Sequence, residues 1–147
     1  MRYLFFPAML LLTCCGPQPT TLEDFPTRPL TLPGGQVIKV ETMIDNVELL
    51  RGMMFRTQLA PNRGMLFVYP KPNRYQMFMY QTYIPLDIIF MDSNRNIVDM
   101  VENAPPCKTQ ASKCPKYGGA TFSSYALEIG AGMAKKYGLR LGQTLQW

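Results

Sequence analysis

The sequence contains no histidine. This absence excludes catalytic pairs in which an imidazole activates a serine or a cysteine, and it excludes imidazole metal ligands. Charge is also sparse, at 17% of the residues, and no run of Lys or Arg is dense enough to predict a nucleic-acid patch. The formal charge of +5 therefore indicates a mildly basic, solvated surface.

Hydrophobic runs long enough to cross a membrane are absent too. The apolar run at the N-terminus, residues 1–12, falls short of the roughly 20 apolar residues that a bilayer requires, and it fits the core of a secretory signal. The Leu-Thr-Cys-Cys-Gly segment that follows resembles the bacterial lipobox, with Cys15 as the expected lipidated residue and Cys14 as the alternative. We therefore predict a signal peptide over residues 1–15 and a lipid anchor in the cell envelope, on its periplasmic or outer face. An ordinary cleaved signal, or merely a hydrophobic N-terminus, is the competing interpretation.

Residues 16–35 contain five prolines and no periodic apolar pattern. This composition predicts a semi-extended linker that holds a folded domain away from the membrane. The remaining residues, 36–147, are enough for one domain with a hydrophobic core, and the apolar fraction of 47% indicates a globular protein.

The stretch from Met77 to Asp92 organises that domain. It holds two apolar runs that are broken at Ile84-Pro85, where proline favours a kink or a turn. After the break, both faces of the predicted strand 86–92 are mostly apolar, so we expect a central strand that is covered on both sides. Asp87 is the exception, because it places a carboxylate among apolar neighbours.

The other segments predict further short strands and two small helices. Asp45 and Glu48 have the spacing of a capping box at the start of a helix over 46–53, and Gly138 is expected to end a second helix over 131–137. The expected fold is therefore mainly β within the α+β class, a single β-sandwich or partly open barrel. Its remaining strands are predicted at residues 36–42, 64–69, 75–82, 97–102, 124–129 and 143–147.

Two further cysteines, Cys107 and Cys114, lie in a proline-rich loop, separated by six residues. In an exported chain, loop cysteines this close together predict a disulfide bond. A metal or redox pair is the alternative, although two thiolates without other soft ligands rarely close a metal site.

Five short motifs, taken in order, resemble the bacterial and archaeal domain of unknown function 192 family. The resemblance implies a jelly-roll type of sandwich that is often exported or lipid-anchored. The family has no established activity, so the resemblance assigns no catalytic residue. Family members typically carry a Lys-Asn pair where this chain has Tyr80 and Gln81, so any role of that lysine is missing here. The motifs are Arg51–Arg56, Arg63–Tyr69, Phe78-Met79 with Thr82–Asp87, Glu102–Cys107 and Tyr125–Glu128.

Polar residues beside these motifs form the candidate site. One interpretation is a ligand-binding cluster at the mouth of the sandwich. The other is structural: Asp87 is buried and is either paired with Arg51 or Arg56 or hydrogen-bonded to loop amides. The cluster consists of Asp87, Arg51, Arg56, Glu102 and Asn103.

The function that the sequence favours is a non-enzymatic binding or interaction module for an envelope glycan or protein. It is expected to be monomeric, with no cofactor, no metal and no nucleic-acid partner. One alternative is an enzyme acting on an envelope polymer through two carboxylates, Asp87 with Glu102 or Glu128. The other is a Cu(I) protein that uses thioethers such as Met77 and Met79, which are expected on one strand face, although methionine also serves as adaptable core filler.

Overall fold

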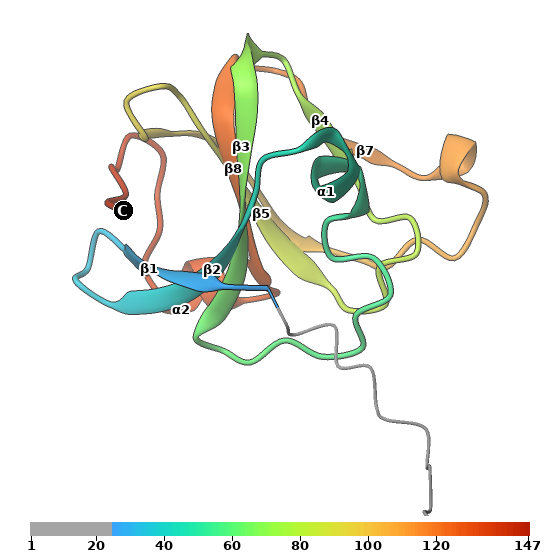
Figure 1. Cartoon of the computed structure of the whole chain (residues 1–147), viewed down its shortest axis with the longest axis horizontal. Coiled ribbons are helices and arrows are strands. Elements are labelled where there is room, and N and C mark those ends of the chain that lie inside the picture. The colour runs from blue at the N-terminus through green and yellow to red at the C-terminus, as the bar shows by residue number, and fades with distance from the viewer. Residues whose placement is uncertain (1–24) are drawn as a thin grey trace, which may run out of the picture.

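The computed structural model describes residues 25–147, and its centre is a six-stranded sheet (Figure 1). The strand order is β1, β2, β3, β8, β5, β6. The bounds are β1 Thr27–Thr31, β2 Val37–Met43, β3 Arg63–Asn73, β5 Leu86–Met91, β6 Ile97–Ala104 and β8 Ser123–Gly130. A separate two-stranded ribbon pairs β4 (Gln76–Phe78) with β7 (Lys116–Gly118).

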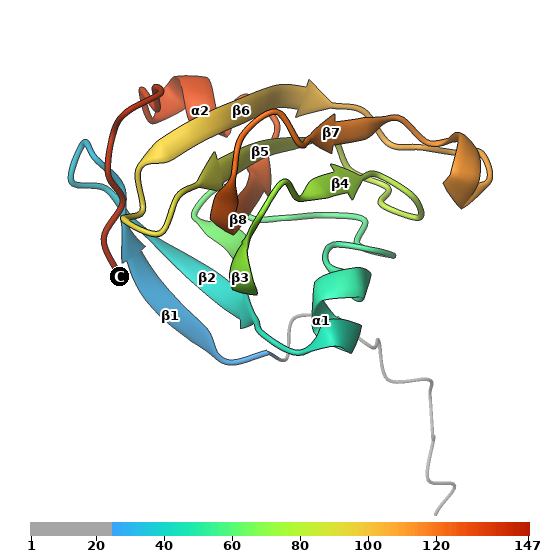
Figure 2. The same ribbon diagram turned by 90° about the horizontal axis from the view of Figure 1, so that it is seen from above.

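Two short α-helices and a turn of 3-10 helix complete the described residues. They are α1 (Asn46–Arg51), α2 (Met133–Lys136) and the 3-10 turn Ala111–Lys113. Neither α1 nor α2 is long and apolar enough to cross a membrane, and no other α-helix occurs in residues 25–147. The sheet is curved but is not closed into a barrel (Figure 2), so the predicted β-rich class with two short helices is confirmed.

The pairing of β2 with β3 is parallel, whereas the other pairings in the sheet are antiparallel. A parallel pair needs a long crossover connection, and α1 with the loop after it supplies this connection. The crossover begins with the predicted capping box, in which Asp45 accepts the amide hydrogens of Val47 and Glu48. This crossover lies over one face of the sheet (Figure 1).

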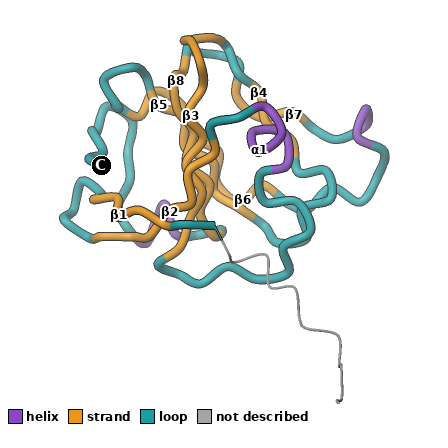
Figure 3. The backbone as a smooth tube through the Cα atoms, viewed as in Figure 1, coloured by secondary structure: helices purple, strands orange, loops and turns teal. Residues whose placement is uncertain are grey.

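Both faces of the sheet are covered by hydrophobic clusters. On one face, Ile89 and Met91 pack with Ala134 of α2 and with Leu145 of the C-terminal segment. On the other face, Leu86, Ile88 and Phe90 of β5 pack with Met53, which follows α1. Figure 3 shows the strands in the centre and the loops on both sides. All six residues of β5 are buried, and the strand lies between β8 and β6, which confirms the predicted central strand.

The structure corrects the predicted linker. Strand β1 forms within residues 16–35 and pairs antiparallel with β2, and Leu30 is fully buried. Proline does not prevent this, because β1 is an edge strand and an edge strand tolerates a residue that has no amide donor. The folded unit therefore begins before residue 36. Residues 16–24, the predicted signal peptide and Cys15 lie outside the described residues.

The predicted final strand over 143–147 is wrong. This segment makes only isolated bridges, from Gln146 to Thr31 of β1 and from Thr144 to Asn96 before β6. It thus connects the two edges of the curved sheet, and Leu145 fills the core between these contacts. Pairing at single points with two different partners does not make a regular ladder.

Candidate functional site

Helix α1 lies over one face of the sheet (Figure 2). A pocket of about 330 Å³ is lined by residues of α1 and of strands β3 and β4. Most of its lining side chains are aromatic, methionine or leucine. The principal ones are Leu49, Leu50, Met53, Met54, Phe67, Tyr69, Tyr75, Met77, Phe78 and Glu128. Its volume and its apolar lining with a single carboxyl group match the features of small-molecule sites.

Gly52 shapes the wall between α1 and the sheet. It ends α1 with a positive φ of 45°, a conformation that favours glycine. A Cβ atom at this position would lie 3.0 Å from the ring of Phe67 and 3.8 Å from Oε2 of Glu128. The backbone can therefore pass close over the pocket floor only because no side chain is present.

Two stacked tyrosines form the opposite wall. The ring centroids of Tyr69 and Tyr75 are 3.7 Å apart with an interplanar angle of 16°. The hydroxyl of Tyr75 donates to the carbonyl oxygen of Lys71 at 2.9 Å, which fixes the outer ring. The stacked pair is a rigid aromatic surface, so a ligand can pack on it with little further loss of side-chain entropy.

Glu128 supplies the only acidic side chain in the pocket lining. Ala126 of the same strand packs in the cluster on this face, and Glu128 follows two residues later, on the same side of β8. Glu128 is 4% exposed, and its Oε2 atom is buried without a hydrogen-bond partner. A buried polar atom without a partner is rare, so this oxygen requires an explanation.

The environment of Glu128 favours the neutral carboxyl group. Desolvation raises the pKa of Glu128 to about 8, while the positive charge of Arg56 lowers it by a smaller amount. Burial also raises the pKa of Tyr69, and the neighbouring Glu128 adds to that shift. At neutral pH the pocket therefore presents a protonated carboxyl and a neutral phenol, both of which can donate hydrogen bonds.

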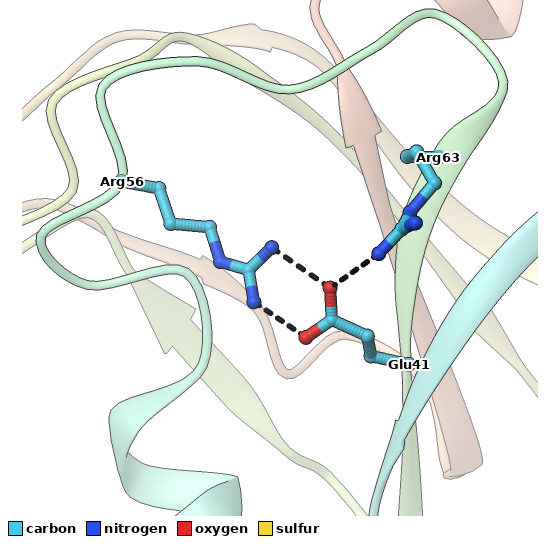
Figure 4. Close-up of polar contacts among 3 residues, drawn as sticks. All are labelled: Glu41, Arg56 and Arg63. Carbon is cyan, nitrogen blue, oxygen red and sulfur yellow. Dashed lines mark hydrogen bonds and ion pairs between the residues drawn. The ribbon is translucent and has the colours of Figure 1, made fainter. Parts of the chain in front are cut away.

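A buried ion network holds the loop that follows α1 (Figure 4). Arg56 donates to both carboxylate oxygens of Glu41, at 2.9 and 2.5 Å, and Arg63 donates to one of them at 3.2 Å. Glu41 is fully buried and Arg56 almost so. The network joins β2, β3 and the loop that contains Arg56, so it fixes the position of the pocket wall relative to the sheet.

The predicted pairing of Asp87 with an arginine is wrong. Asp87 is fully buried, and its carboxylate accepts the amide hydrogens of Asn103 and Ala134, each at 2.8 Å. These bonds tie β5 to the irregular end of β6 and to the start of α2. Backbone amides satisfy the carboxylate without a second buried charge, which agrees with the structural alternative of loop amides.

The structure separates the five candidate residues. Arg51 is exposed and lines the pocket, Arg56 is paired with Glu41, and Glu102 is exposed on β6. Asp87 and Asn103 come together, but through the backbone amide of Asn103. They do not form one polar cluster, because their partners lie on different elements.

The structure does not assemble the residues of the two alternative sites, the pair of carboxylates and the methionine site for Cu(I). Asp87 has both oxygens occupied by amides, so it does not combine with Glu102 as a free acid pair. Met77 lines the pocket, whereas Met79 lies beyond the end of β4 in the core, so they do not share a strand face. Within residues 25–147, no group of three or more Cys, Asp or Glu side chains is placed to hold a metal ion.

Comparison with known proteins identifies the family. The DUF192 family, described as "Uncharacterized ACR", has a sequence profile that matches residues 30–147. This chain belongs to the DUF192 family. None of the curated proteins matches it. The match begins within β1, in agreement with a folded unit that starts before residue 36.

Two solved structures resemble this DUF192 domain. A protein of unknown function from Novosphingobium aromaticivorans DSM 12444 is 28% identical, with a TM-score of 0.76, and the match covers 91% of this chain and 94% of that chain. A protein from Sinorhizobium meliloti 1021, described as a candidate transcription regulator, is 31% identical, with a TM-score of 0.69, and the match covers 80% of this chain and 89% of that chain. These similarities support the fold, and function has to be argued from the site itself.

A second cavity, of about 520 Å³, lies beside the loop cysteines. Cys107 and Cys114 form a disulfide in the structure, as predicted. The cavity is lined in part by Tyr80 and Gln81. It contains no buried ionisable group, so the pocket with Glu128 is the stronger candidate site.

Sequence reasoning named Glu128 only as a second acid for a hydrolase, and it did not identify Glu41 or Tyr69 as site residues. The available signal was a glutamate within an apolar strand, at residues 124–129 and again at 36–42. Which glutamate gains a partner depends on the neighbouring strands, because an arginine from a distant loop reaches Glu41 and none bonds to Oε2 of Glu128.

We predict that Asp87→Asn destabilises the fold. The two backbone amides bond to different oxygens of Asp87, and asparagine replaces one of these oxygens with an NH2 group that cannot accept, so one buried amide hydrogen of Asn103 or Ala134 loses its acceptor. The expected loss in the free energy of unfolding is about 2–4 kcal/mol. Denaturant unfolding measures it. Asp45→Asn is the matched control, with an expected change below about 0.5 kcal/mol because asparagine also caps helices. Similar losses in both variants would contradict the role assigned to Asp87.

Glu128 also predicts how stability depends on pH. Its pKa in the folded protein, about 8, exceeds its ordinary value of 4.5. The folded state therefore binds the proton more tightly than the unfolded state does. The stability that this difference contributes is fully present below the unfolded pKa and is lost as pH rises through the folded pKa. The loss between pH 5 and pH 9 is on the order of 4 kcal/mol.

Glu128→Gln is expected to remove this loss and to be more stable than the wild type at pH 9, because the amide has no charge to bury. Denaturant unfolding of both proteins at pH 5, 7 and 9 measures the difference. If the stability of Glu128→Gln fell with pH as steeply as that of the wild type, another group would be responsible.

Proposed function

We propose that this DUF192 domain is a non-enzymatic binding module and that its ligand is a small, mostly apolar molecule held in the pocket between α1, β3 and β4. The observation that carries the proposal is an apolar pocket of about 330 Å³ with one buried, unpartnered carboxyl oxygen at its floor. Apolar surface supplies the affinity in such sites, and a few polar atoms orient the ligand.

The rim of the pocket supports this proposal. Leu50 is 67% exposed although it lines the pocket, and Val47, one turn earlier on α1, is 76% exposed. Ile44 precedes the same helix and is also exposed. Neighbouring exposed apolar side chains are uncommon on a surface that has no partner, and they favour entry of an apolar ligand at this end.

Binding is favoured over catalysis by the chemistry of the lining. Hydrolysis of the glycosidase type needs two carboxyl groups on opposite sides of the scissile bond. Glu128 is the single acidic residue around the pocket. A lone protonated acid can orient a ligand by a hydrogen bond, but it does not by itself provide the acid and base of that mechanism.

The proposal includes attachment to the cell envelope through a lipid on Cys15. The sequence supports it through the apolar N-terminal run, the lipobox-like segment and the prolines between Gly16 and Asp24. A nine-residue tether reaches about 30 Å at most, so the domain would stay near the membrane surface. Membrane lipid or periplasmic solutes would then be the pool from which the ligand is drawn.

Acetophenone, a small neutral aromatic molecule, is the ligand that tests the pocket. The methyl groups of Met54 and Met77, which line the pocket, report its binding. Titration of the full chain in nanodiscs, followed by methionine-methyl NMR, is expected to move both signals to saturation. Leu50→Trp places a bulky ring at the rim and is expected to weaken binding by at least about tenfold, or about 1.4 kcal/mol. Val47→Trp is the matched control on the same helix. Unmoved methyl signals, or equal weakening in both variants, would reject the pocket as a binding site.

The anchor has a test of its own. Mass spectrometry of the mature protein isolated from membranes is expected to show an N-terminal cysteine at position 15 that carries acyl chains. The substitution Cys15→Ser is expected to abolish the acyl mass, whereas Cys14→Ser leaves it in place. A soluble product that begins after Gly16 without any acyl mass would refute the anchor and would leave the pocket proposal unaffected.

A further inference from the structure

The strongest unexplained feature of the molecule is the carboxyl group of Glu128. Two other carboxylates buried in the same sheet have partners: Glu41 accepts from two arginines and Asp87 from two backbone amides. Oε2 of Glu128 has none and lies against the pocket. Because a buried polar group without a partner is costly, the missing partner is expected to come from the ligand.

We propose that the pocket selects an uncharged ligand, an aromatic or aliphatic body that bears a carbonyl or ether oxygen, and that the protonated carboxyl of Glu128 donates a hydrogen bond to that oxygen. This inference rests on the proposed function, since it specifies the ligand class of the same pocket. The apolar body would lie between the Met53–Met54 segment and the stacked rings of Tyr69 and Tyr75.

The charges around Glu128 favour a neutral ligand. Arg56, from the loop after α1, is the charged group that acts on the pKa of Glu128, which it lowers. Its guanidinium is already bonded to Glu41 of β2. A cationic ligand would meet the positive charge of Arg56 and would require Glu128 to lose its proton. An anionic ligand would have to give up its hydration beside a protonated acid, and the guanidinium of Arg56 is already bonded to Glu41, so desolvation of the ligand charge is not repaid.

The remaining titratable groups in and around the pocket do not change this preference for a neutral ligand. Tyr69 from β3 stays a neutral phenol, because burial raises its pKa. Arg63 of β3 bonds to Glu41, and Tyr75 bonds through its hydroxyl to a backbone carbonyl. Arg51 at the end of α1 is exposed at the rim, where water screens its charge. The protonation state of Glu128 therefore decides the charge that a ligand meets in the pocket.

This assignment makes binding depend on pH in a defined direction. A ligand that needs the protonated acid binds fully below the pKa of Glu128 and loses affinity above it. With a pKa of about 8, affinity is expected to fall about tenfold from pH 6 to pH 9. A cationic ligand that pairs with the ionised carboxylate would show the opposite trend.

The experiment uses three probes with one phenyl ring: acetophenone, benzamidinium and benzoate. Each is titrated at pH 6 and pH 9 into the full chain in nanodiscs, and the methyl signals of Met54 and Met77 report occupancy of the pocket. Acetophenone is expected to bind most tightly at pH 6 and to weaken about tenfold at pH 9. Glu128→Gln retains a hydrogen-bond donor that does not titrate, so its affinity for acetophenone is expected to stay within about threefold of the wild type at pH 6 and to be the same at pH 9.

The outcomes separate this inference from the proposed function. If no probe moves the Met54 and Met77 signals at either pH, the pocket does not bind such ligands and both proposals fail. If benzamidinium or benzoate binds best, if acetophenone binds equally at both pH values, or if its pH dependence persists in Glu128→Gln, only the inference about the ligand class is overturned. The methionine-methyl spectrum of Glu128→Gln without a probe shows that the variant is folded.

Discussion

The cost of burying carboxylates in a sheet that is covered on both faces is the constraint on which this structure depends. Three of them, Glu41, Asp87 and Glu128, lie in β2, β5 and β8, and each is almost completely removed from water. An uncompensated charge in such surroundings would remove a large part of a typical domain's net stability, so each group requires a partner or a proton. Each of the three meets this requirement in a different way.

The three solutions divide the molecule into framework and site. Glu41 fixes the loop after α1 through Arg56, and Asp87 fixes the start of α2 and the end of β6 through backbone amides. Glu128 keeps its proton and remains without a partner at Oε2, next to the glycine that lets the backbone pass over the pocket floor. The pocket is thus held by the first two groups and receives its single carboxyl group from the third.

Much of the framework could be read from local sequence. The apolar run of β5 predicted a central strand, Asp45 and Glu48 predicted a helix start, and the cysteine spacing predicted the disulfide, because each signal depends on residues close together in the chain. Strand β1 was missed because its prolines indicate a linker, and only pairing with β2 makes it a strand. The C-terminal segment was misread for the converse reason, since its partners are at two separate edges.

The sequence by itself determined the β-rich class, the family and the absence of imidazole chemistry. Only the tertiary structure decided which buried acid is satisfied and how. An arginine placed 15 residues after Glu41 reaches it because the crossover folds back over the sheet, whereas Asp87 is reached by the amide of Ala134, 47 residues away. Partners of this kind are set by strand order and loop path, which a linear pattern of residue types does not encode, and for that reason the open carboxyl of Glu128 became visible only in the folded chain.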